Sequence, residues 1–187
     1  MENGIYFAGN KFLKHLRLAA VESEKKEMTI VNFYDKVDDT LLKFAVIIAK
    51  TQGRYVFCKH RERYTWEVPG GHREPGEVIL DTAKRELYEE TGAVLFDIRP
   101  VCAYSVVKEG DYAGQESFGM LYYADISSFQ TELRSESYGE GVVLIGELEE
   151  LHSEIEKIMI TDKMPEAWTY PEIQPKLLEE ARKRGFI

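Results

Sequence analysis

Residues 71–93 read GHREPGEVILDTAKRELYEETGA, and this stretch decides how the chain folds. It opens on the glycine turn of Gly70 and Gly71, and it closes on Gly92. Between these turns the pattern predicts a helix over residues 77–90. The stretch is rich in acidic residues: Glu74, Glu77, Asp81, Glu86, Glu89 and Glu90. A helix that gathers so many carboxylates beside a glycine turn requires a physical reason.

A helical wheel shows where those carboxylates should lie. Successive residues turn by about 100°, so Ile79, Ala83 and Leu87 form an apolar stripe that should face the rest of the protein. Glu90 falls within that stripe and Glu86 at its edge. Burying carboxylates side by side is costly unless a cation compensates their charge. Because Mg²⁺ and Mn²⁺ bind carboxylate oxygens, the wheel favours a metal site on this helix.

A simpler interpretation stays open for each of these residues. The acids would then be a solvated charge run that pairs with Lys84 and Arg85. Arg85 would form an ordinary i,i+4 pair with Glu89, instead of orienting a catalytic carboxylate. Gly70 would only make a tight turn, instead of bringing a backbone carbonyl close to a metal ion. The position of Glu90 on the wheel favours the metal site over this alternative.

The spacing of these residues resembles the Nudix box, G-x5-E-x7-R-E-U-x-E-E-x-G-U, in which U is a bulky aliphatic residue. Leu87 takes the first aliphatic position, whereas Ala93 is a small residue where a larger one is usual. Residues 66–71, WEVPGG, also resemble the strand and turn that lead into the box. The glycine and charged positions are filled by Gly71, Glu77, Arg85, Glu86, Glu89, Glu90 and Gly92. So many fixed positions at fixed spacings make the resemblance specific.

The resemblance implies an α/β fold, namely an α/β/α sandwich around a mixed β-sheet, in which the box forms a loop, a helix and a loop. It also implies hydrolysis of a nucleoside diphosphate linked to another group, with Mg²⁺ or Mn²⁺ as the cofactor. Carried onto this sequence, it gives the metal ion these ligands: Glu86, Glu90, Glu89, the Gly70 carbonyl and, directly or by holding another ligand, Glu77.

The resemblance also assigns the catalytic groups. Arg85 would hold a carboxylate in place, so the expected catalytic residues are Glu86, Arg85 and Glu89. A carboxylate would take the proton from the attacking water. The family varies in this base, and Glu86, Glu136 and Glu140 all stay open. For the last two, the alternative is a solvated loop acid.

The substrate is less constrained by the sequence. Lys59, Arg61 and Arg63 precede the box in a chain that is otherwise acidic, and they would either bind substrate phosphates or form an exposed basic loop. Residues 116–126 and 136–151 are similar to those of small bacterial members that hydrolyse nucleoside triphosphates, including 8-oxo-dGTP. We therefore expect a triphosphate to be cleaved to the monophosphate and pyrophosphate. The alternatives are an RNA 5′-end pyrophosphohydrolase, a nucleotide-binding module without catalysis, and an acidic helix with a structural role.

Composition narrows the class of protein. The 187 residues carry a formal net charge of −9, which disfavours binding to extended nucleic acid. Two cysteines, Cys58 and Cys102, are no disulfide framework. The sequence shows no signal peptide, and its longest apolar run, residues 44–49, is too short to span a bilayer. We expect a cytoplasmic protein that binds a nucleotide and no membrane.

The remaining pattern predicts the organisation of the chain. Residues 1–27 would be an extension, which leaves a homodimer open; residues 28–160 would be the Nudix domain, and residues 161–187 a proline-rich segment and helix packed on it. Residues 127–139 are expected to be polar and irregular. Strands are predicted over residues 29–34, 41–50, 54–59, 116–126 and 142–147 and within 94–107. Helices are predicted, besides that of the box, over residues 148–158 and 176–184.

Overall fold

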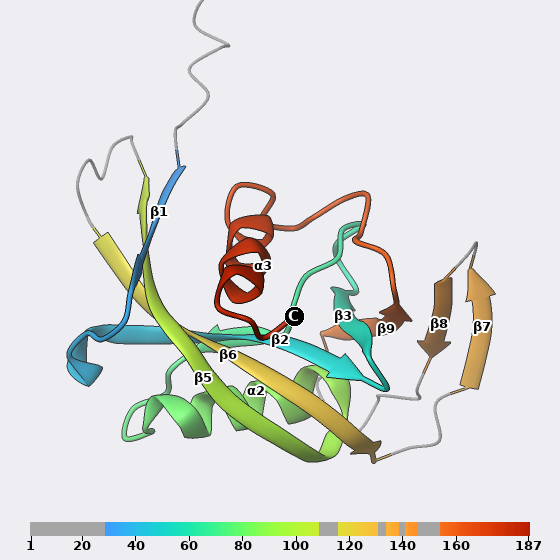
Figure 1. Cartoon of the computed structure of the whole chain (residues 1–187). Helices are drawn as coiled ribbons and strands as arrows, with labels where there is room; N and C mark the ends of the chain where they lie inside the picture. The colour runs from blue at the N-terminus through green and yellow to red at the C-terminus, as the bar shows by residue number, and fades with distance from the viewer. Residues whose placement is uncertain (1–28, 109–115, 131–133, 139–140, 146–153) are drawn as a thin grey trace, which may run out of the picture.

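The computed structural model describes residues 29–108, 116–130, 134–138, 141–145 and 154–187. One large sheet forms its middle layer, and a helix packs on each face of that sheet (Figure 1). Helix α2 (Ile79–Thr91) lies on one face and helix α3 (Gln174–Lys183) on the other. The chain therefore has the α/β/α sandwich with a mixed sheet that the sequence predicts.

The sheet runs in the order β1-β5-β6-β2-β3-β9-β8-β7, and β4 pairs separately with β2. Strands β2 and β6 are parallel, whereas the other pairs are antiparallel. A 3-10 turn, η1 (Asp39–Leu41), precedes β2. The strands are β1 (Thr29–Tyr34), β2 (Leu42–Thr51), β3 (Arg54–His60), β4 (Gly70–His72), β5 (Ala93–Lys108), β6 (Glu116–Phe129), β7 (Arg134–Tyr138), β8 (Gly141–Ile145) and β9 (Ile155–Thr161).

One edge of β2 is shared by two strands, and this sharing positions the glycine turn. The first half of β2 pairs with β4, where Val46 lies opposite Gly70. The second half pairs with β3, where Ala49 lies opposite Val56. Between them the Ile47 amide donates to the Pro69 carbonyl at 2.8 Å. Residues before the box are thus fixed to the central strand on the same edge as β3.

Each face of the sheet has its own apolar core. On the α2 side, the stripe of Ile79, Ala83 and Leu87 packs into a cluster with residues of β2, β3, β6 and β9, as the wheel predicts. On the α3 side, Leu177, Leu178 and Ala181 are buried together with aromatic residues of the sheet.

Two sequence predictions are wrong. Residues 148–158 were expected to be helical, but Ile155 begins strand β9, and residues 146–153 lie outside the described residues. Strand β9 fills the free edge of β3 and pairs its backbone groups, which outweighs an apolar spacing that suits a helix. Residues 127–139 were expected to be irregular, yet they contain the end of β6 and all of β7.

The C-terminal segment is joined to the strand that leads into the box. Backbone hydrogen bonds run from the Trp66 amide to the Ala167 carbonyl at 3.0 Å and from the Thr169 amide to the Trp66 carbonyl at 2.9 Å. The ring of Trp168 packs edge-on against Phe57.

Neither helix of the described part is long and apolar enough to cross a membrane. The predicted N-terminal extension, residues 1–27, lies outside the described residues.

Truncating α3 at its buried face should destabilise the whole protein. Leu177 is fully buried, so Leu177→Ala is expected to lower the free energy of unfolding by about 2–5 kcal/mol. Urea unfolding measures this change, with the exposed Glu179→Gln as a control that should stay within about 0.5 kcal/mol of the unchanged chain. Equal stability of Leu177→Ala and Glu179→Gln would show that α3 is not part of the core.

Candidate active site

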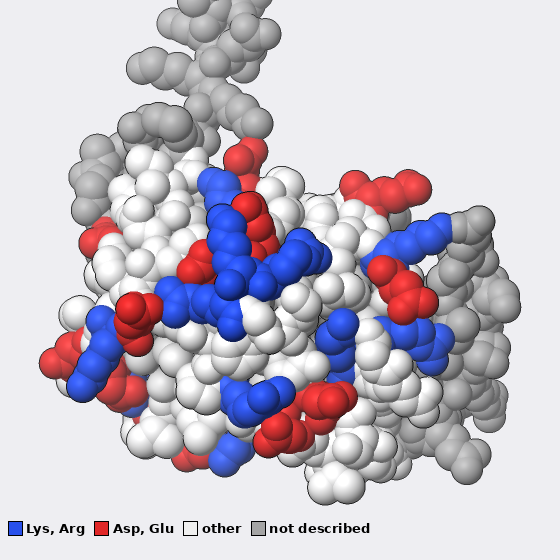
Figure 2. Space-filling model, viewed as in Figure 1, with Lys and Arg blue, Asp and Glu red and all other residues white. Residues whose placement is uncertain are grey.

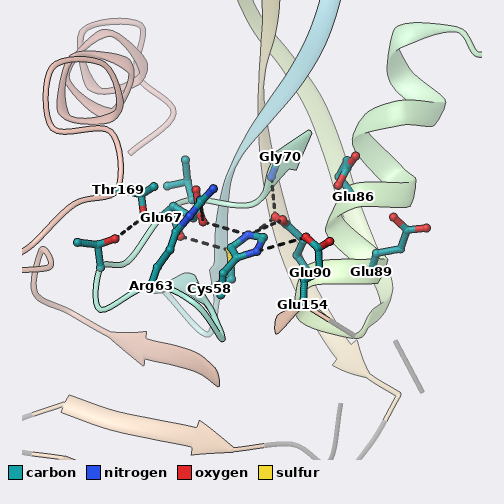
Figure 3. Close-up of polar contacts among 12 residues, drawn as sticks. Cys58, Arg63, Glu67, Gly70, Glu86, Glu89, Glu90, Glu154 and Thr169 are labelled. Carbon is teal, nitrogen blue, oxygen red and sulfur yellow. Dashed lines mark hydrogen bonds and ion pairs between the residues drawn. The ribbon is translucent and has the colours of Figure 1, made fainter. Parts of the chain in front are cut away.

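Helix α2 presents its acidic residues to the glycine turn. It ends at Gly92, whose left-handed backbone (φ 73°) lets its amide close the last turn on the Tyr88 carbonyl. Its apolar stripe packs on the sheet and fixes the rotation of the helix about its axis. Glu86, Glu89 and Glu90 then lie on the side of α2 that faces Gly70 (Figure 3).

The carboxylates of Glu86 and Glu90 are buried, as the wheel predicts. Glu86 is 8% exposed and Glu90 is 6% exposed, whereas Glu89 is half-buried. Burial, together with the nearby negative charge of Glu90, raises the pKa of Glu86 above its ordinary value. The interpretation of these acids as a solvated charge run is therefore wrong for Glu86 and Glu90.

Both oxygens of the Glu90 carboxylate have partners. Oε2 accepts the backbone N–H of Gly70 at 2.8 Å and lies 3.6 Å from Sγ of Cys58. Oε1 lies 3.3 Å from Nε2 of His60. Strands β3 and β4 thus hold the end of this side chain between them.

The Glu86 carboxylate packs directly on Gly71. A Cβ atom placed on Gly71 would overlap the Glu86 carboxylate, and a Cβ on Gly70 would lie only 2.5 Å from the Ala45 carbonyl oxygen. Only residues without a side chain leave this space at the turn. Close approach to the backbone of β2 therefore requires glycine at position 70, whereas a side chain at position 71 would displace the Glu86 carboxylate.

Arg85 links the start of the box to the acidic end of the helix. It donates to Glu77 twice, from Nε at 2.8 Å and from Nη2 at 3.1 Å. Its Nη1 is shared between Glu86 Oε1 at 2.8 Å and Glu89 Oε2 at 3.0 Å. Arg85 thus makes its bidentate contact with Glu77, and the i,i+4 pair with Glu89 is present as well.

Glu77 accepts hydrogen bonds from two groups besides its ion-pair partner Arg85. Besides Arg85, the Glu74 amide donates to it at 3.0 Å and the Thr82 hydroxyl at 2.8 Å. These donors, Arg85 first, lower the pKa of Glu77 to about 2. Glu77 is thereby fixed across the loop of the box.

Sequence reasoning missed two residues that lie at the Glu90 end of the site, His60 and Glu67. His60 Nε2 lies 3.0 Å from Glu67 Oε1 as well as 3.3 Å from Glu90 Oε1. Hydrogen bonds to the two carboxylates raise the pKa of His60 to about 9, so its imidazole is charged at neutral pH. The strand alternation of β3, which turns Val56, Cys58 and His60 to the same face as α2, was the available signal.

Of the three basic residues predicted to bind substrate phosphates, Lys59, Arg61 and Arg63, only Arg63 contacts the acidic cluster. Arg63 lies at the site, where Nη1 donates to Glu67 Oε1 at 2.9 Å. Lys59 pairs with Glu156 of β9 at 2.9 Å. Arg61 is exposed.

Of the open candidates for the general base, Glu136 lies in β7, whose side chains are not described, and Glu140 lies outside the described residues.

The donor set suits a hard divalent cation. Carboxylate oxygens of Glu86, Glu89 and Glu90 and the backbone of a close-packed glycine turn are the ligand types that Mg²⁺ and Mn²⁺ prefer. Within the described ranges, no three acidic, histidine or cysteine side chains already stand at ligand spacing. Glu86 and Glu89, which now share Arg85, would need to turn their oxygens toward the ion.

Comparison with known proteins identifies the class to which this fold and site belong. The family model of the NUDIX domain matches residues 39–162, so the chain belongs to the Nudix family. It is an enzyme, a pyrophosphohydrolase that acts on phosphoanhydride bonds. Nudix hydrolases generally use divalent metal ions.

Alignments with individual relatives extend over most of this chain. It is 28% identical to the putative 8-oxo-dGTP diphosphatase YtkD of Bacillus subtilis, over 84% of this chain and 91% of that protein. Its fold is similar to that of a mutant of the Bacillus subtilis pyrophosphohydrolase BsRppH, with a TM-score of 0.62 and 21% identity over 88% and 96% of the two chains. It also resembles a Nudix hydrolase of Nitrosomonas europaea, with a TM-score of 0.54 and 17% identity over 76% and 89%.

A methyl group on Gly71 should displace Glu86 while sparing the fold. Because the overlap is with the end of a flexible side chain, Gly71→Ala is expected to leave stability nearly unchanged. Misplacing a catalytic group by about 1 Å costs on the order of 10²-fold, and kcat/KM for hydrolysis should fall by a similar factor.

Gly53→Ala is the matched control. Gly53 lies in the β2–β3 turn with φ 80° and open space around it. Alanine there should destabilise the fold by about 1–2 kcal/mol and leave kcat/KM unchanged. Full activity of Gly71→Ala would contradict the close packing of Glu86 on the turn.

Proposed function

We propose that this Nudix hydrolase cleaves nucleoside triphosphates, oxidised ones such as 8-oxo-dGTP included, to the monophosphate and pyrophosphate. The similarity to YtkD over most of both chains supports this substrate class. The observation that carries the metal-dependent hydrolysis in this proposal is the excess of acidic side chains at the site. Six carboxylates lie against the three cationic groups of His60, Arg63 and Arg85, and they belong to Glu67, Glu77, Glu86, Glu89, Glu90 and the more exposed Glu154.

A divalent cation would compensate the negative charge that these cationic groups leave unpaired. When bound, Mg²⁺ or Mn²⁺ would neutralise phosphate oxygens and lower the pKa of a bound water. In this proposal Glu86 and Glu90 are its main ligands, and Glu89 and the Gly70 carbonyl complete the set. Glu77, already held by donors on both oxygens, would keep Arg85 in place without binding the ion itself.

The chain's own groups would divide the remaining work. Arg85 would orient Glu86 and Glu89 through its shared Nη1. Glu86 is one candidate to accept the proton of the attacking water. Glu136 and Glu140 stay open as alternative bases. Arg63, the one of the three predicted basic residues that lies at the acidic cluster, would contact substrate phosphate while its Nη1 keeps its contact with Glu67.

The second candidate is pyrophosphate removal from the 5′ end of RNA. It is favoured by 40% identity over 47 residues, 25% of this chain and 27% of the relative, to an RNA pyrophosphohydrolase of a Psychrobacter species. On the face in Figure 2, basic and acidic side chains are interspersed, which suits contact with one RNA end better than with a long strand. We also expect the protein to work in the cytoplasm; a homodimer stays open.

A substrate panel tests the reaction. Nucleoside triphosphates, 8-oxo-dGTP and a 5′-triphosphorylated RNA are each incubated with Mg²⁺ or Mn²⁺, and inorganic phosphate and pyrophosphate are scored separately. We expect the highest kcat/KM with a free nucleoside triphosphate as the substrate. One pyrophosphate should be released for each monophosphate formed. A preference for the RNA would select the second candidate. Nucleotide binding with no product from any substrate would instead define a binding module.

Replacing either main ligand should lower turnover strongly and preserve the fold. Glu86→Gln and Glu90→Gln are expected to lower kcat by about 10²-fold or more, in the range of a lost catalytic acid or base. The free energy of unfolding of Glu86→Gln should be equal or higher, because a buried carboxylate beside another is costly. Lys84→Gln, on the exposed side of the same helix, is the control that should keep full activity. Normal turnover in Glu86→Gln or Glu90→Gln would refute the assignment.

A further inference from the structure

Two residues from outside the Nudix box are linked to Glu90, His60 by direct contact and Glu67 through His60. His60 ends strand β3, and Glu67 lies in the segment before the glycine turn (Figure 3). One nitrogen, Nε2 of His60, lies between the two carboxylates, 3.0 Å from Glu67 Oε1 and 3.3 Å from Glu90 Oε1. Both acids are almost fully buried, at 5% and 6% exposure. Nε2 of His60 is therefore paired with two carboxylates at once.

The contacts leave the Glu90 carboxylate little freedom to rotate. His60 reaches one of its oxygens, and the Gly70 amide donates to the other at 2.8 Å. Oε2 also accepts from the Cys58 thiol at 3.6 Å, whereas Oε1 has His60 as its partner and keeps a lone pair for a metal ion. Hydrogen bonds to a ligating carboxylate usually set its direction.

Glu67 is itself rigidly supported. Its segment pairs with Cys58 by two backbone hydrogen bonds, at 2.9 and 3.0 Å, and Arg63 holds its carboxylate at 2.9 Å. On the other side, Trp66 pairs with the C-terminal segment at Ala167 and Thr169. The carboxylate of Glu67 thus reaches His60 from a fixed position.

We propose that His60 and Glu67 are positioning residues that aim the Glu90 carboxylate at the metal ion. This inference rests on the proposed role of Glu90 as a metal ligand. The competing possibility is that His60 only neutralises the buried acids. In that case removing it would leave metal binding unchanged, or would strengthen it by adding uncompensated negative charge.

Direct binding of Mn²⁺ to the full chain, measured by calorimetry without substrate, separates these cases. His60→Leu removes the donor and should weaken Mn²⁺ binding by about 10–100-fold, the usual effect of losing a hydrogen-bond partner of a ligand. His60→Gln keeps an N–H donor and should recover part of that loss. In hydrolysis assays, the Mn²⁺ concentration for half-maximal rate should rise in His60→Leu, while kcat at saturating Mn²⁺ should change little.

Three further variants make the result decisive. Lys84→Gln should bind Mn²⁺ normally, and Glu67→Gln, which keeps the shape of the side chain, should weaken binding in the same direction as His60→Leu. Equal or tighter binding in His60→Leu, or in Glu67→Gln if the leucine variant does not fold, overturns the positioning role. Glu90→Gln separates the ligand role of Glu90 from the positioning role of His60. Normal Mn²⁺ binding by Glu90→Gln would overturn the assignment of Glu90 as a ligand. Lost Mn²⁺ binding by Glu90→Gln, together with normal binding by His60→Leu, would overturn the positioning role alone.

Discussion

The burial of two carboxylates against a glycine turn is the constraint on which this site depends. Glu86 and Glu90 lie on the face of α2 that packs toward the sheet, and each is less than a tenth exposed. Unpaired carboxylates do not stay ionised in such a place without compensation. The structure supplies part of that compensation through Arg85 and His60. A divalent cation would supply the rest.

Much of this arrangement could be predicted from the sequence, because a helix has a fixed period. The wheel placed Glu86 and Glu90 on the buried face from the positions of Ile79, Ala83 and Leu87 alone. The glycine turn and the strands of the β2–β3 hairpin were predicted from residue types with strong local preferences. These features depend on neighbours along the chain, which a sequence displays directly.

The features that sequence missed depend on contacts between distant segments. His60 and Glu67 become part of the site only because β3 lies beside α2, so their role follows from the sheet order. Strand β9 was predicted as a helix because the spacing of three residues between Ile155 and Ile158 fits a helix and not a regular strand. In the structure β9 pairs with the edge of β3, and an irregularity between Ile155 and Lys157 lets Ile155 and Ile158 enter the same core. Glu77 gained its donors from the folding of the box loop upon itself, which its spacing alone does not show.

The central claim is that the buried acids of α2 are completed by a divalent cation, and metal-linked stability tests it most directly. Urea unfolding of the unchanged chain and of Glu90→Gln is measured with EDTA and with Mg²⁺ in excess. A ligand that binds only the folded state stabilises it by about 2.7 kcal/mol at one hundred times its dissociation constant. The unchanged chain should gain stability with Mg²⁺, and Glu90→Gln should gain far less. Equal gains in the two proteins, or no gain in the unchanged chain, would contradict a metal site built on Glu90.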